Sequence, residues 1–230
     1  MKLHRFFCDD KLTNRKSVVI THAPLVNQLK NVFRLKSGDE VVLFDNSGFD
    51  FFVTIDDIQK DSVSFIVNKV NQNNVFSLRE TYLFASVVKK DNFEWITQKA
   101  TELGVSHIIP IISERTEKKD LNIDRIQKII IEAAEQSGRG TLPVLYDVID
   151  LDSALQKFGH VKSIAWHTKA EKFVSQDLEN ILGAYIGPEG GWSDSEIDSF
   201  KKHGIQVRSL GPQILRSETA VISVITLSVF

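Results

Sequence analysis

A chain of 230 residues is long enough for one large domain or two modest ones. Apolar residues make up 42% of it and charged residues 25%, a balance that excludes an intrinsically disordered chain and a coiled coil. The longest apolar runs, such as Ile108–Ile112, contain a proline or soon reach a charge, and none approaches the roughly 20 residues that a membrane-spanning helix needs.

The net charge of −2, taken alone, argues against a nucleic-acid partner, but the charges are unevenly distributed. Residues 1–30 hold six basic and two acidic side chains, whereas residues 31–72 hold four basic and seven acidic ones. A local basic face can attract a phosphate backbone although the whole chain is mildly acidic. An ordinary solvated surface is the alternative interpretation.

Cys8 is the single cysteine of the chain, so there is no intrachain disulfide, which suits a reducing compartment. The N-terminal residues contain no apolar stretch long enough for a signal peptide. We therefore expect a cytoplasmic protein with no membrane segment.

The first 72 residues contain short segments with the pattern of strands. Val41–Asp45 and Phe49–Ile55 are apolar, and the Asp-Asn-Ser-Gly sequence between them is typical of a hairpin turn. Ser62–Val70 alternates with period two, which places Val63, Phe65, Val67 and Lys69 on one face. A short helix is predicted over Ala23–Val32, with Thr21 near its start. Several short strands with one helix indicate a small β-barrel.

The polar, aperiodic residues 71–74 mark a domain boundary, so we predict one domain over residues 1–72 and a second over 73–230. In the second region strands alternate with helices, which is typical of an α/β domain with a largely parallel sheet. The predicted strands are Tyr82–Val88, His107–Ile112, Val144–Val148, Ser163–Trp166, Ala184–Gly187 and Gln206–Leu210. The predicted helices begin at Asp91 (with Glu94 as its capping partner), Asn122, Ser153 and Ser193, and the first two end at Gly104 and Gly138.

A glycine-rich loop follows a predicted strand and leads into a predicted helix at Ile186–Ser193. Ser193 and Glu196 form a capping box that fixes the start of that helix. The glycines of Pro-Glu-Gly-Gly allow backbone amides to approach a ligand closely, and ligands of open α/β sheets bind at the carboxyl ends of strands. The loop is not a phosphate loop, because no Gly-Lys-Ser/Thr follows it. A tight turn between strand and helix is the alternative.

A second loop, Leu210–Ala220, also follows a strand and enters a helix, with Arg216 and Glu218 at the helix start. These two side chains could simply pair on a solvated first turn. An arginine is unfavourable at the positive end of a helix dipole, however, which favours a functional role.

Other kinds of site are less well supported. The segment Glu132–Arg139 places Gln136 and Arg139 at a helix end, but core packing and an ordinary surface explain such a pattern more often than function does. The six histidines have no His-x-x-x-His spacing or cysteine partner, so we expect no metal site. There is no Gly-x-Ser-x-Gly nucleophile elbow.

Taken in order, these segments resemble the bacterial 16S rRNA (uracil-N3)-methyltransferase family, the RsmE-like branch of the SPOUT superfamily. Gly-Pro-Glu-Gly-Gly followed by Ile-Leu-Arg-x-Glu-Thr-Ala is the most specific part of the match. Gln213 departs from the family pattern, because the family usually carries arginine at this position. The departure affects one contact and not membership of the family. The segments that carry the resemblance are His4–Phe7, Phe33–Leu35, Gly38–Asp39, Gln98–Val105, Glu114–Arg115, Glu132–Arg139 with Pro143, Ile186–Ser193 and Leu210–Ala220.

The resemblance implies an N-terminal PUA-like β-barrel and a C-terminal SPOUT α/β domain with a trefoil knot. It implies a homodimer with the active site at the subunit interface, and S-adenosyl-L-methionine as cofactor. Backbone groups of the two loops would hold the cofactor, completed by the loop after Trp166. The implied cofactor-binding residues are Trp166, His167, Ile186, Gly187, Pro188, Glu189, Gly190, Gly191, Leu210, Gly211, Ile214, Leu215, Arg216 and Thr219.

The implied reaction moves a methyl group to N3 of a specific uridine in 16S rRNA of the small ribosomal subunit. N3–H must lose a proton and the negative charge spreads onto O2 and O4, so an arginine near those oxygens would stabilise the transition state. We expect Arg216 in this role, with Arg139 or Arg5 as alternates. Glu189 and Glu218 are candidate bases, and solvent is another. Arg5, Lys16 and Arg34 are our candidates for binding RNA by its phosphates.

Three other functions stay open at this point. A related knotted methyltransferase acting on tRNA or on a 2′-hydroxyl would share the fold and the cofactor. A non-catalytic RNA-binding protein and a metabolic enzyme with a small-molecule substrate are the others. Analysis of the modified nucleoside, cofactor titration and RNA binding would separate them.

Overall fold

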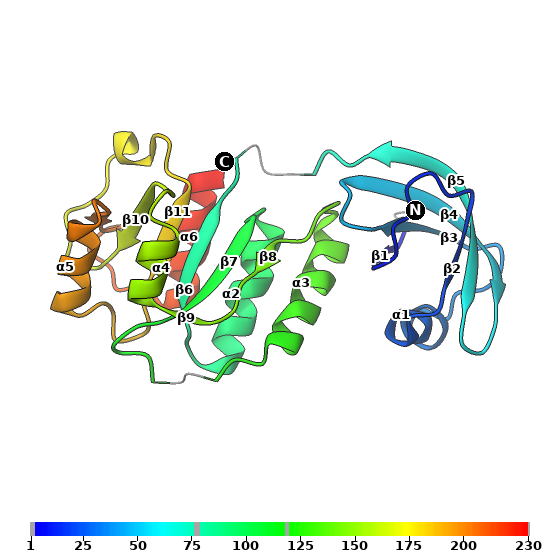
Figure 1. Ribbon diagram of the computed structural model, residues 1–230, viewed down its shortest axis with the longest axis horizontal. Coiled ribbons are helices and arrows are strands. Elements are labelled where there is room, and N and C mark those ends of the chain that lie inside the picture. Colours follow the sequence, from blue (N-terminus) through cyan, green and yellow to red (C-terminus); the bar gives the residue numbers. More distant parts are fainter. Residues whose placement is uncertain (1–2, 76–78, 118–119, 230) are drawn as a thin grey trace. The chain divides into compact units, whose positions relative to one another are not determined.

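The structure is a computed structural model that describes residues 3–75, 79–117 and 120–229. The chain forms two compact units, each with one β-sheet (Figure 1). Unit 1 comprises Met1–Phe76 and Ala134–Leu142, and unit 2 comprises Ser77–Ala133 and Pro143–Phe230. The sequence pattern gave no sign that 134–142 belongs with the first 76 residues. The predicted domain boundary between residues 72 and 73 stays a prediction.

Unit 1 is built on a five-stranded sheet with the order β1-β3-β4-β5-β2. Only β1 runs parallel to its neighbour, β3; the other pairs are antiparallel. In the described part of the unit, β1 and β2 are the two edges, so the sheet is an open barrel rather than a closed one. The strands are β1 (Arg5–Phe7), β2 (Ser17–Ile20), β3 (Glu40–Phe44), β4 (Phe49–Ile58) and β5 (Val63–Gln72).

The predicted helix of unit 1 is one turn of α-helix, α1 (Ala23–Asn27), that continues as a π-helical turn, Gln28–Val32. Its N-cap is His22 and not Thr21, and no side chain caps it. Pro24, in the first turn, favours the start of the helix instead, because the fixed φ of proline suits that position.

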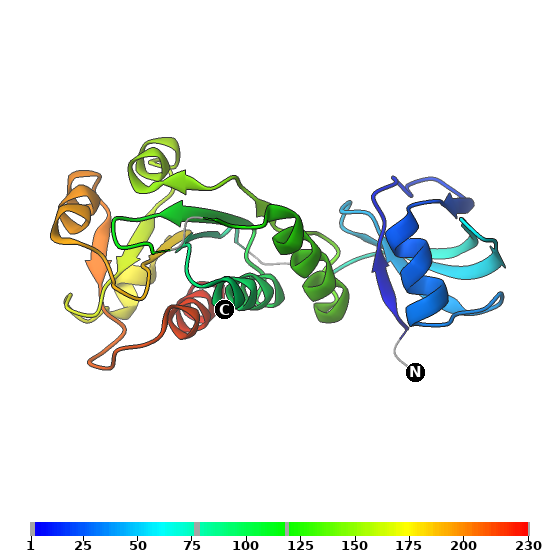
Figure 2. The same ribbon diagram turned by 90° about the horizontal axis from the view of Figure 1, so that it is seen from below.

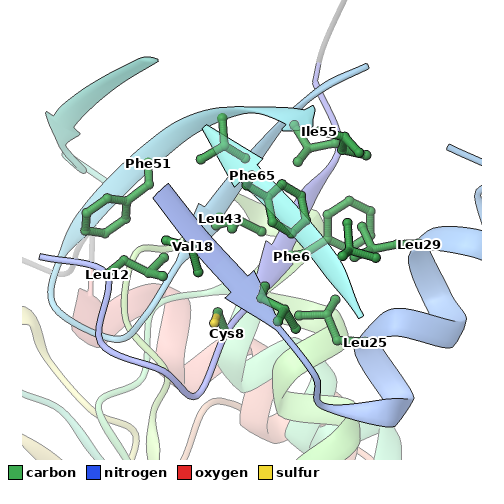
Figure 3. Close-up of a cluster of buried hydrophobic side chains, with 14 of the residues drawn as sticks. Phe6, Cys8, Leu12, Val18, Leu25, Leu29, Leu43, Phe51, Ile55 and Phe65 are labelled. Carbon is green, nitrogen blue, oxygen red and sulfur yellow. The ribbon is translucent and has the colours of Figure 1, made fainter. Parts of the chain in front are cut away.

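The core of unit 1 lies between the curved sheet and this helix (Figure 3). Leu25 and Leu29 from the helix meet Phe6, Leu43 and Phe65 from three strands, and all five side chains are buried. The prediction for the third strand is correct for Val63 and Phe65, which are buried, but wrong for Lys69, which is exposed.

The reason for this error is a β-bulge. Phe52 pairs with Lys69, whereas the next residue, Val53, pairs with Val67, so Asn68 is an extra residue in β5. One extra residue reverses the alternation of side chains, which turns Lys69 away from the core. The strand pattern alone did not reveal where the two partners change register.

The predicted hairpin turn between β3 and β4 is confirmed. Asn46 and Gly48 adopt left-handed backbone conformations, with φ of 63° and 81°. The buried Asp45 carboxylate accepts the backbone N–H of Leu12 at 2.8 Å and bonds to Ser47 within the turn.

Unit 2 is an α/β layer with a seven-stranded, wholly parallel sheet, as the alternation of strands and helices predicted. The order is β12-β10-β11-β6-β7-β8, with β9 also paired to β7. The strands are β6 (Tyr82–Ser86), β7 (His107–Ile112), β8 (Val144–Leu145), β9 (Ile149–Asp150), β10 (Ser163–Trp166), β11 (Gly183–Ile186) and β12 (Gln206–Arg208).

Helices cover both faces of this sheet. Figures 1 and 2 show α4 and α5 on one face and α2 and α6 side by side on the other. The described part of the chain has no helix long and apolar enough to cross a membrane. The helices are α2 (Lys90–Glu102), α3 (Ile123–Ser137), α4 (Leu151–Lys157), α5 (Asp194–Lys202) and α6 (Ser217–Val229), with a 3-10 turn at Ser175–Leu178.

The predicted start is confirmed for α3 and wrong for α2. Asn122 begins α3 as predicted, because its side chain accepts the backbone N–H of Arg125 at 3.0 Å. The predicted cap of α2 is wrong: the N-cap is Lys89, without a side-chain bond. Asp91 lies one position inside the helix, where its charge favours the positive end of the helix dipole.

Only Val144–Leu145 of the predicted strand Val144–Val148 is strand, as β8, and the next strand, β9, begins after it at Ile149; Pro110 in β7 explains the break. Residues Ser106 and Ile108 direct their carbonyls toward β8, so by alternation Pro110 faces the same side. Proline has no N–H to donate there, and β7 pairs with β8 through His107–Ile108 and with β9 through Ile111–Ile112. The ladder is interrupted where proline cannot continue it.

Gly183 generates a stability prediction, because β10 and β11 carry the loops described below. A Cβ on Gly183 would collide with Oγ of Ser163 on β10 and lie 3.1 Å from Ser163 Cβ. We expect Gly183→Ala to lower the free energy of unfolding by about 1–3 kcal/mol in urea denaturation, the usual cost of overpacking a core. Ser163→Ala should make the second substitution less costly, because the colliding hydroxyl is then absent. Strictly additive effects in the double variant would contradict this packing.

Candidate active site

A pocket of about 370 Å³ lies at the carboxyl ends of three neighbouring strands of unit 2, β12, β10 and β11. Ligands of parallel α/β sheets bind at this edge, where the connecting loops meet. The pocket is lined by residues 166–169, 186–192, 209–211 and 213–215, together with Arg115, Asp194, Ser217 and Ala220.

The glycine-rich loop after β11 is fixed at its far end by the predicted capping box. The Oγ of Ser193 accepts the N–H of Glu196 at 3.2 Å, and the Glu196 carboxylate accepts the N–H of Ser193 at 2.8 Å. The buried Glu196 also accepts the N–H of Glu114, at 2.8 Å, from the loop that follows β7. One carboxylate therefore joins the start of α5 to a segment about 80 residues earlier.

Trp192 closes the base of the same loop. It is buried, and its Nε1 donates to the carbonyl oxygen of Trp166 at 3.0 Å, which joins the loop after β11 to the end of β10. A Cβ on Gly187 would lie 3.2 Å from the Trp192 ring, so glycine allows this close packing. Gly191 has φ +66°, a conformation that glycine adopts without strain. Trp192 is thus part of the core and not an exposed stacking surface.

Arg115 is a lining residue that the sequence interpretation named only within the segment Glu114–Arg115 of the family resemblance, without giving it a role. Its Nη1 donates to the carbonyl oxygens of Gly190, at 2.8 Å, and Trp192, at 3.2 Å. The sequence contained Glu114-Arg115 at the end of a strand, but nothing in the spacing related it to a loop 75 residues later. Only the pairing of the strands brings the two segments together.

The second predicted loop follows β12 and joins the first. The Ser209 backbone bonds to Glu171 and Phe173, and its hydroxyl bonds to both backbone polar groups of Gly211. The Oγ of Ser217, the first residue of α6, donates to the carbonyl oxygen of Gly187 at 3.0 Å. The structure therefore brings the two Gly-Pro loops into one pocket.

His167 borders the pocket at the end of β10 and its backbone N–H donates to the Arg208 carbonyl at 2.8 Å. Partial burial lowers the pKa of the imidazole below its ordinary value, and the positive charges of Lys169 and Arg115 lower it further, while Asp194 opposes them. The neutral imidazole is therefore favoured near pH 7. It lies beside Gly191, where a Cβ would be 3.9 Å from its Nδ1.

Most of the predicted cofactor-binding residues line this one pocket. Arg216 and Thr219 do not. Ser217 and Ala220, three residues apart, face the pocket from α6, so Thr219 lies on a different side of the helix and is exposed. Arg216 accepts the Ala220 N–H with its carbonyl, and its side chain is exposed. The predicted residues that line the pocket are Trp166, His167, Ile186, Gly187, Pro188, Glu189, Gly190, Gly191, Leu210, Gly211, Ile214 and Leu215, and Gln213 joins them.

The predicted catalytic residues lie in different surroundings. Arg216 is exposed and Glu218 is buried, and no ion pair joins them in the described part of the chain, which removes the simple pairing as an explanation. Arg139 belongs to unit 1, where burial lowers its pKa to about 10 and its Nε donates to the Thr141 carbonyl at 3.1 Å. Glu189, a candidate base, is exposed on the pocket wall.

The predicted RNA-binding residues of unit 1 also differ. The Arg5 guanidinium donates to both oxygens of Asp50, at 2.7 and 2.9 Å, and to the carbonyl of Arg139 at 3.1 Å. Its side chain is 9% exposed, so it is occupied within the unit and not presented to a phosphate. Lys16 and Arg34 are exposed.

The pocket combines a glycine-lined wall with charged side chains of both signs. Glycines shape one wall, and the indole Nε1 of Trp166, buried in the lining, has no acceptor among the described residues. Basic Arg115 and Lys169 share the rim with acidic Glu189 and Asp194. No group of three potential metal ligands gathers in the part of the chain that the structure describes.

Family models match most of the chain: an RNA methyltransferase domain over residues 76–229 and an RNA methyltransferase PUA domain over residues 29–68. Among curated proteins, ribosomal RNA small subunit methyltransferase E of Rickettsia conorii is 31% identical, over 98% of this chain and 94% of its own length. The Bacillus subtilis protein of the same name is 29% identical, over 85% of this chain and 83% of its own length.

Solved structures give the same likeness. Ribosomal RNA small subunit methyltransferase E from Neisseria gonorrhoeae, bound to S-adenosyl methionine, superposes with a TM-score of 0.87 at 28% identity, over 97% of this chain and 95% of that one. A putative methyltransferase from Legionella pneumophila, in complex with the same cofactor, gives 0.89 at 28% identity, over 99% and 97%.

Proposed function

We propose, since this chain belongs to the RNA methyltransferase family that includes the ribosomal RNA small subunit methyltransferases E, that it methylates N3 of a specific uridine in 16S rRNA with S-adenosyl-L-methionine. The observation that carries the proposal is the pocket formed by the two Gly-Pro loops, in a chain that matches cofactor-bound structures almost from end to end. The position N3 rests on the family resemblance of the sequence.

The residues of the pocket fit the cofactor. When bound, S-adenosyl-L-methionine supplies a methyl group on a positively charged sulfur. Backbone groups of residues 186–191 and 210–215 would hold it, and Trp166, whose buried Nε1 has no acceptor among the described residues, lines the same pocket. The fixed loops position the reactants, and positioning accounts for much of the rate of a displacement reaction.

The chain's own residues must handle a proton and a negative charge. We propose that Arg216, exposed beside the lining residues Leu215 and Ser217, stabilises the charge that develops on O2 and O4 of the uracil. Arg139 is the alternate. Glu189 is the better placed of the two candidate bases, because it borders the pocket in exposed form whereas Glu218 is buried.

We further propose that the C-terminal part of unit 2 forms a trefoil knot. The family resemblance supports it, and so does the strand order, in which β12 pairs with β10 while α6, next in sequence, packs against β11. Knots are rare in proteins, so neither periodicity nor strand spacing would suggest one.

Unit 1 is the proposed RNA-binding part, consistent with its match to a PUA domain. Lys16 and Arg34 offer exposed cations for phosphates, and the target uridine has to be unpaired for N3 to be reached. We place the reaction in the cytoplasm, on the assembled small ribosomal subunit.

We also propose a homodimer, as the resemblance implies, and α6 supports it. The sequence of α6 is apolar on nearly all sides, a pattern typical of a buried helix, yet Leu227 is 41% exposed. On α2, which packs against α6, Trp95 is 42% exposed. A second copy of the chain would cover these side chains.

The dimer predicts a mass in light scattering of twice the 26.0 kDa of one chain. Leu227→Glu should shift the protein to the monomer, because a charge would be buried in the interface. Val174→Glu is the matched control, since Val174 is also exposed but lies on neither helix. A monomeric wild type, or a dimer that Leu227→Glu leaves intact, would contradict the proposal.

The reaction is tested with radiolabelled S-adenosylmethionine and small ribosomal subunits from cells that lack the enzyme, followed by nucleoside analysis. We expect label in N3-methyluridine of 16S rRNA. Arg216→Ala should keep cofactor binding and lose about 10²–10³ in turnover, the usual effect of removing an electrostatic stabiliser. Arg125→Ala is the control, because Arg125 is an exposed arginine outside the pocket.

Each other outcome has a definite meaning. Unchanged turnover in Arg216→Ala would remove Arg216 from the mechanism. Label in another nucleoside would indicate a different knotted methyltransferase, and bound cofactor without label would indicate a different RNA. Absence of cofactor binding would favour the non-catalytic RNA-binding protein.

A further inference from the structure

Two long basic side chains stand at the rim of the pocket, and cofactor binding by backbone groups does not account for them. Arg115 comes from the loop after β7 and Lys169 from the loop after β10. Both line the pocket and both are exposed. They come from separate segments, so sequence proximity does not explain why they share one rim.

Arg115 is held in place by the protein. Its Nη1 donates to two carbonyl oxygens, those of Gly190 and Trp192, and its aliphatic part lies against Gly190, where a Cβ would come within 3.3 Å of it. A guanidinium carries five N–H donors. In the described part of the chain, Nε and Nη2 donate to no protein acceptor, so the anchored side chain keeps a forked pair of donors for a ligand.

Charged side chains of both signs border this pocket. Glu189 and Asp194 border the same pocket and oppose the two cations. At His167, which lies beside Gly191, Lys169 and Arg115 each lower the pKa of the imidazole more than Asp194 raises it. At the His167 imidazole, the positive charges of Lys169 and Arg115 therefore outweigh the negative charge of Asp194.

We propose that Arg115 and Lys169 bind a backbone phosphate of the RNA next to the target nucleotide, which rests on the proposed function. An anchored guanidinium fork matches the oxygens of a phosphate, and a lysine adds a point charge. Arg115 and Lys169 are both exposed at the surface, over which an RNA strand would run. This exposure favours an RNA phosphate as their ligand over the carboxylate of the cofactor. Phosphate contacts of this kind fix the register of the RNA and leave base recognition to other groups.

The test is filter binding of labelled 16S rRNA, from cells lacking the enzyme, across a series of salt concentrations. Lys169→Ala is the main variant, because Lys169 makes no hydrogen bond to the protein in the described residues. We expect its affinity for RNA to fall about 3–10-fold and the slope of log affinity against log salt to drop by about 0.7, the value for one lost phosphate contact on a single strand. Its affinity for S-adenosylmethionine, measured by calorimetry, should not change.

Arg115→Ala should show the same loss of slope, with cofactor affinity reporting whether the glycine loop has moved. Lys202→Ala is the matched control, since Lys202 is an exposed lysine on α5 that does not line the pocket, and it should leave both measurements unchanged. An unchanged slope with weaker cofactor binding in Lys169→Ala would overturn the proposal in favour of the cofactor's carboxylate. Two unchanged measurements would overturn it as well.

These failures are distinct from failure of the proposed function. The salt slope is measured on binding alone, whereas the proposed function is tested by methyl transfer in the wild-type protein. A wild type that methylates 16S rRNA while Lys169→Ala keeps the full salt slope would reject the phosphate site and leave the proposed function intact.

Discussion

The hydrogen bond from Trp192 Nε1 to the Trp166 carbonyl is the contact on which the pocket depends. It closes the glycine-rich loop onto the end of the neighbouring strand, and Gly187 allows the close packing around it, because a Cβ there would lie 3.2 Å from the indole ring. Ser217 then ties the second loop to the Gly187 carbonyl. The absence of a side chain at Gly187 and the large indole ring of Trp192 thus allow the ends of three strands to form one pocket.

Electrostatic contacts from distant segments hold this arrangement. Glu196 satisfies backbone donors at the start of α5 and in the loop after β7, and Arg115 satisfies two carbonyls of the glycine loop. Glu196 and Arg115 each connect the loop after β7 to the loop after β11. The backbone of the glycine-rich loop is therefore fixed before a ligand binds. Preorganisation of this kind lets backbone groups bind a cofactor without first having to order themselves.

Local rules predicted much of the fold and of the pocket. The capping box at Ser193, the strands His107–Ile112 and Ser163–Trp166, and the two loops depend on neighbouring residues, which the sequence displays directly. Arg115 and the Arg5–Asp50 pair were not foreseen as structural contacts, because partners 75 or 45 residues apart become neighbours only through sheet register. The exposed Lys69 has the same cause, since a bulge in one strand depends on its partner.

The measurement that tests the central claim most directly is calorimetric titration of S-adenosylmethionine into the wild type and into Gly187→Ala. We expect saturable binding to the wild type and a marked loss in the variant, whose added Cβ meets the Trp192 ring at 3.2 Å and shifts the cradle. Gly159→Ala is the matched control, because its added Cβ would be similarly crowded, 3.1 Å from the Leu155 carbonyl oxygen, at a glycine that does not line the pocket. Absence of binding to the wild type, or equal affinity in Gly187→Ala, would contradict the assignment of this pocket to the cofactor.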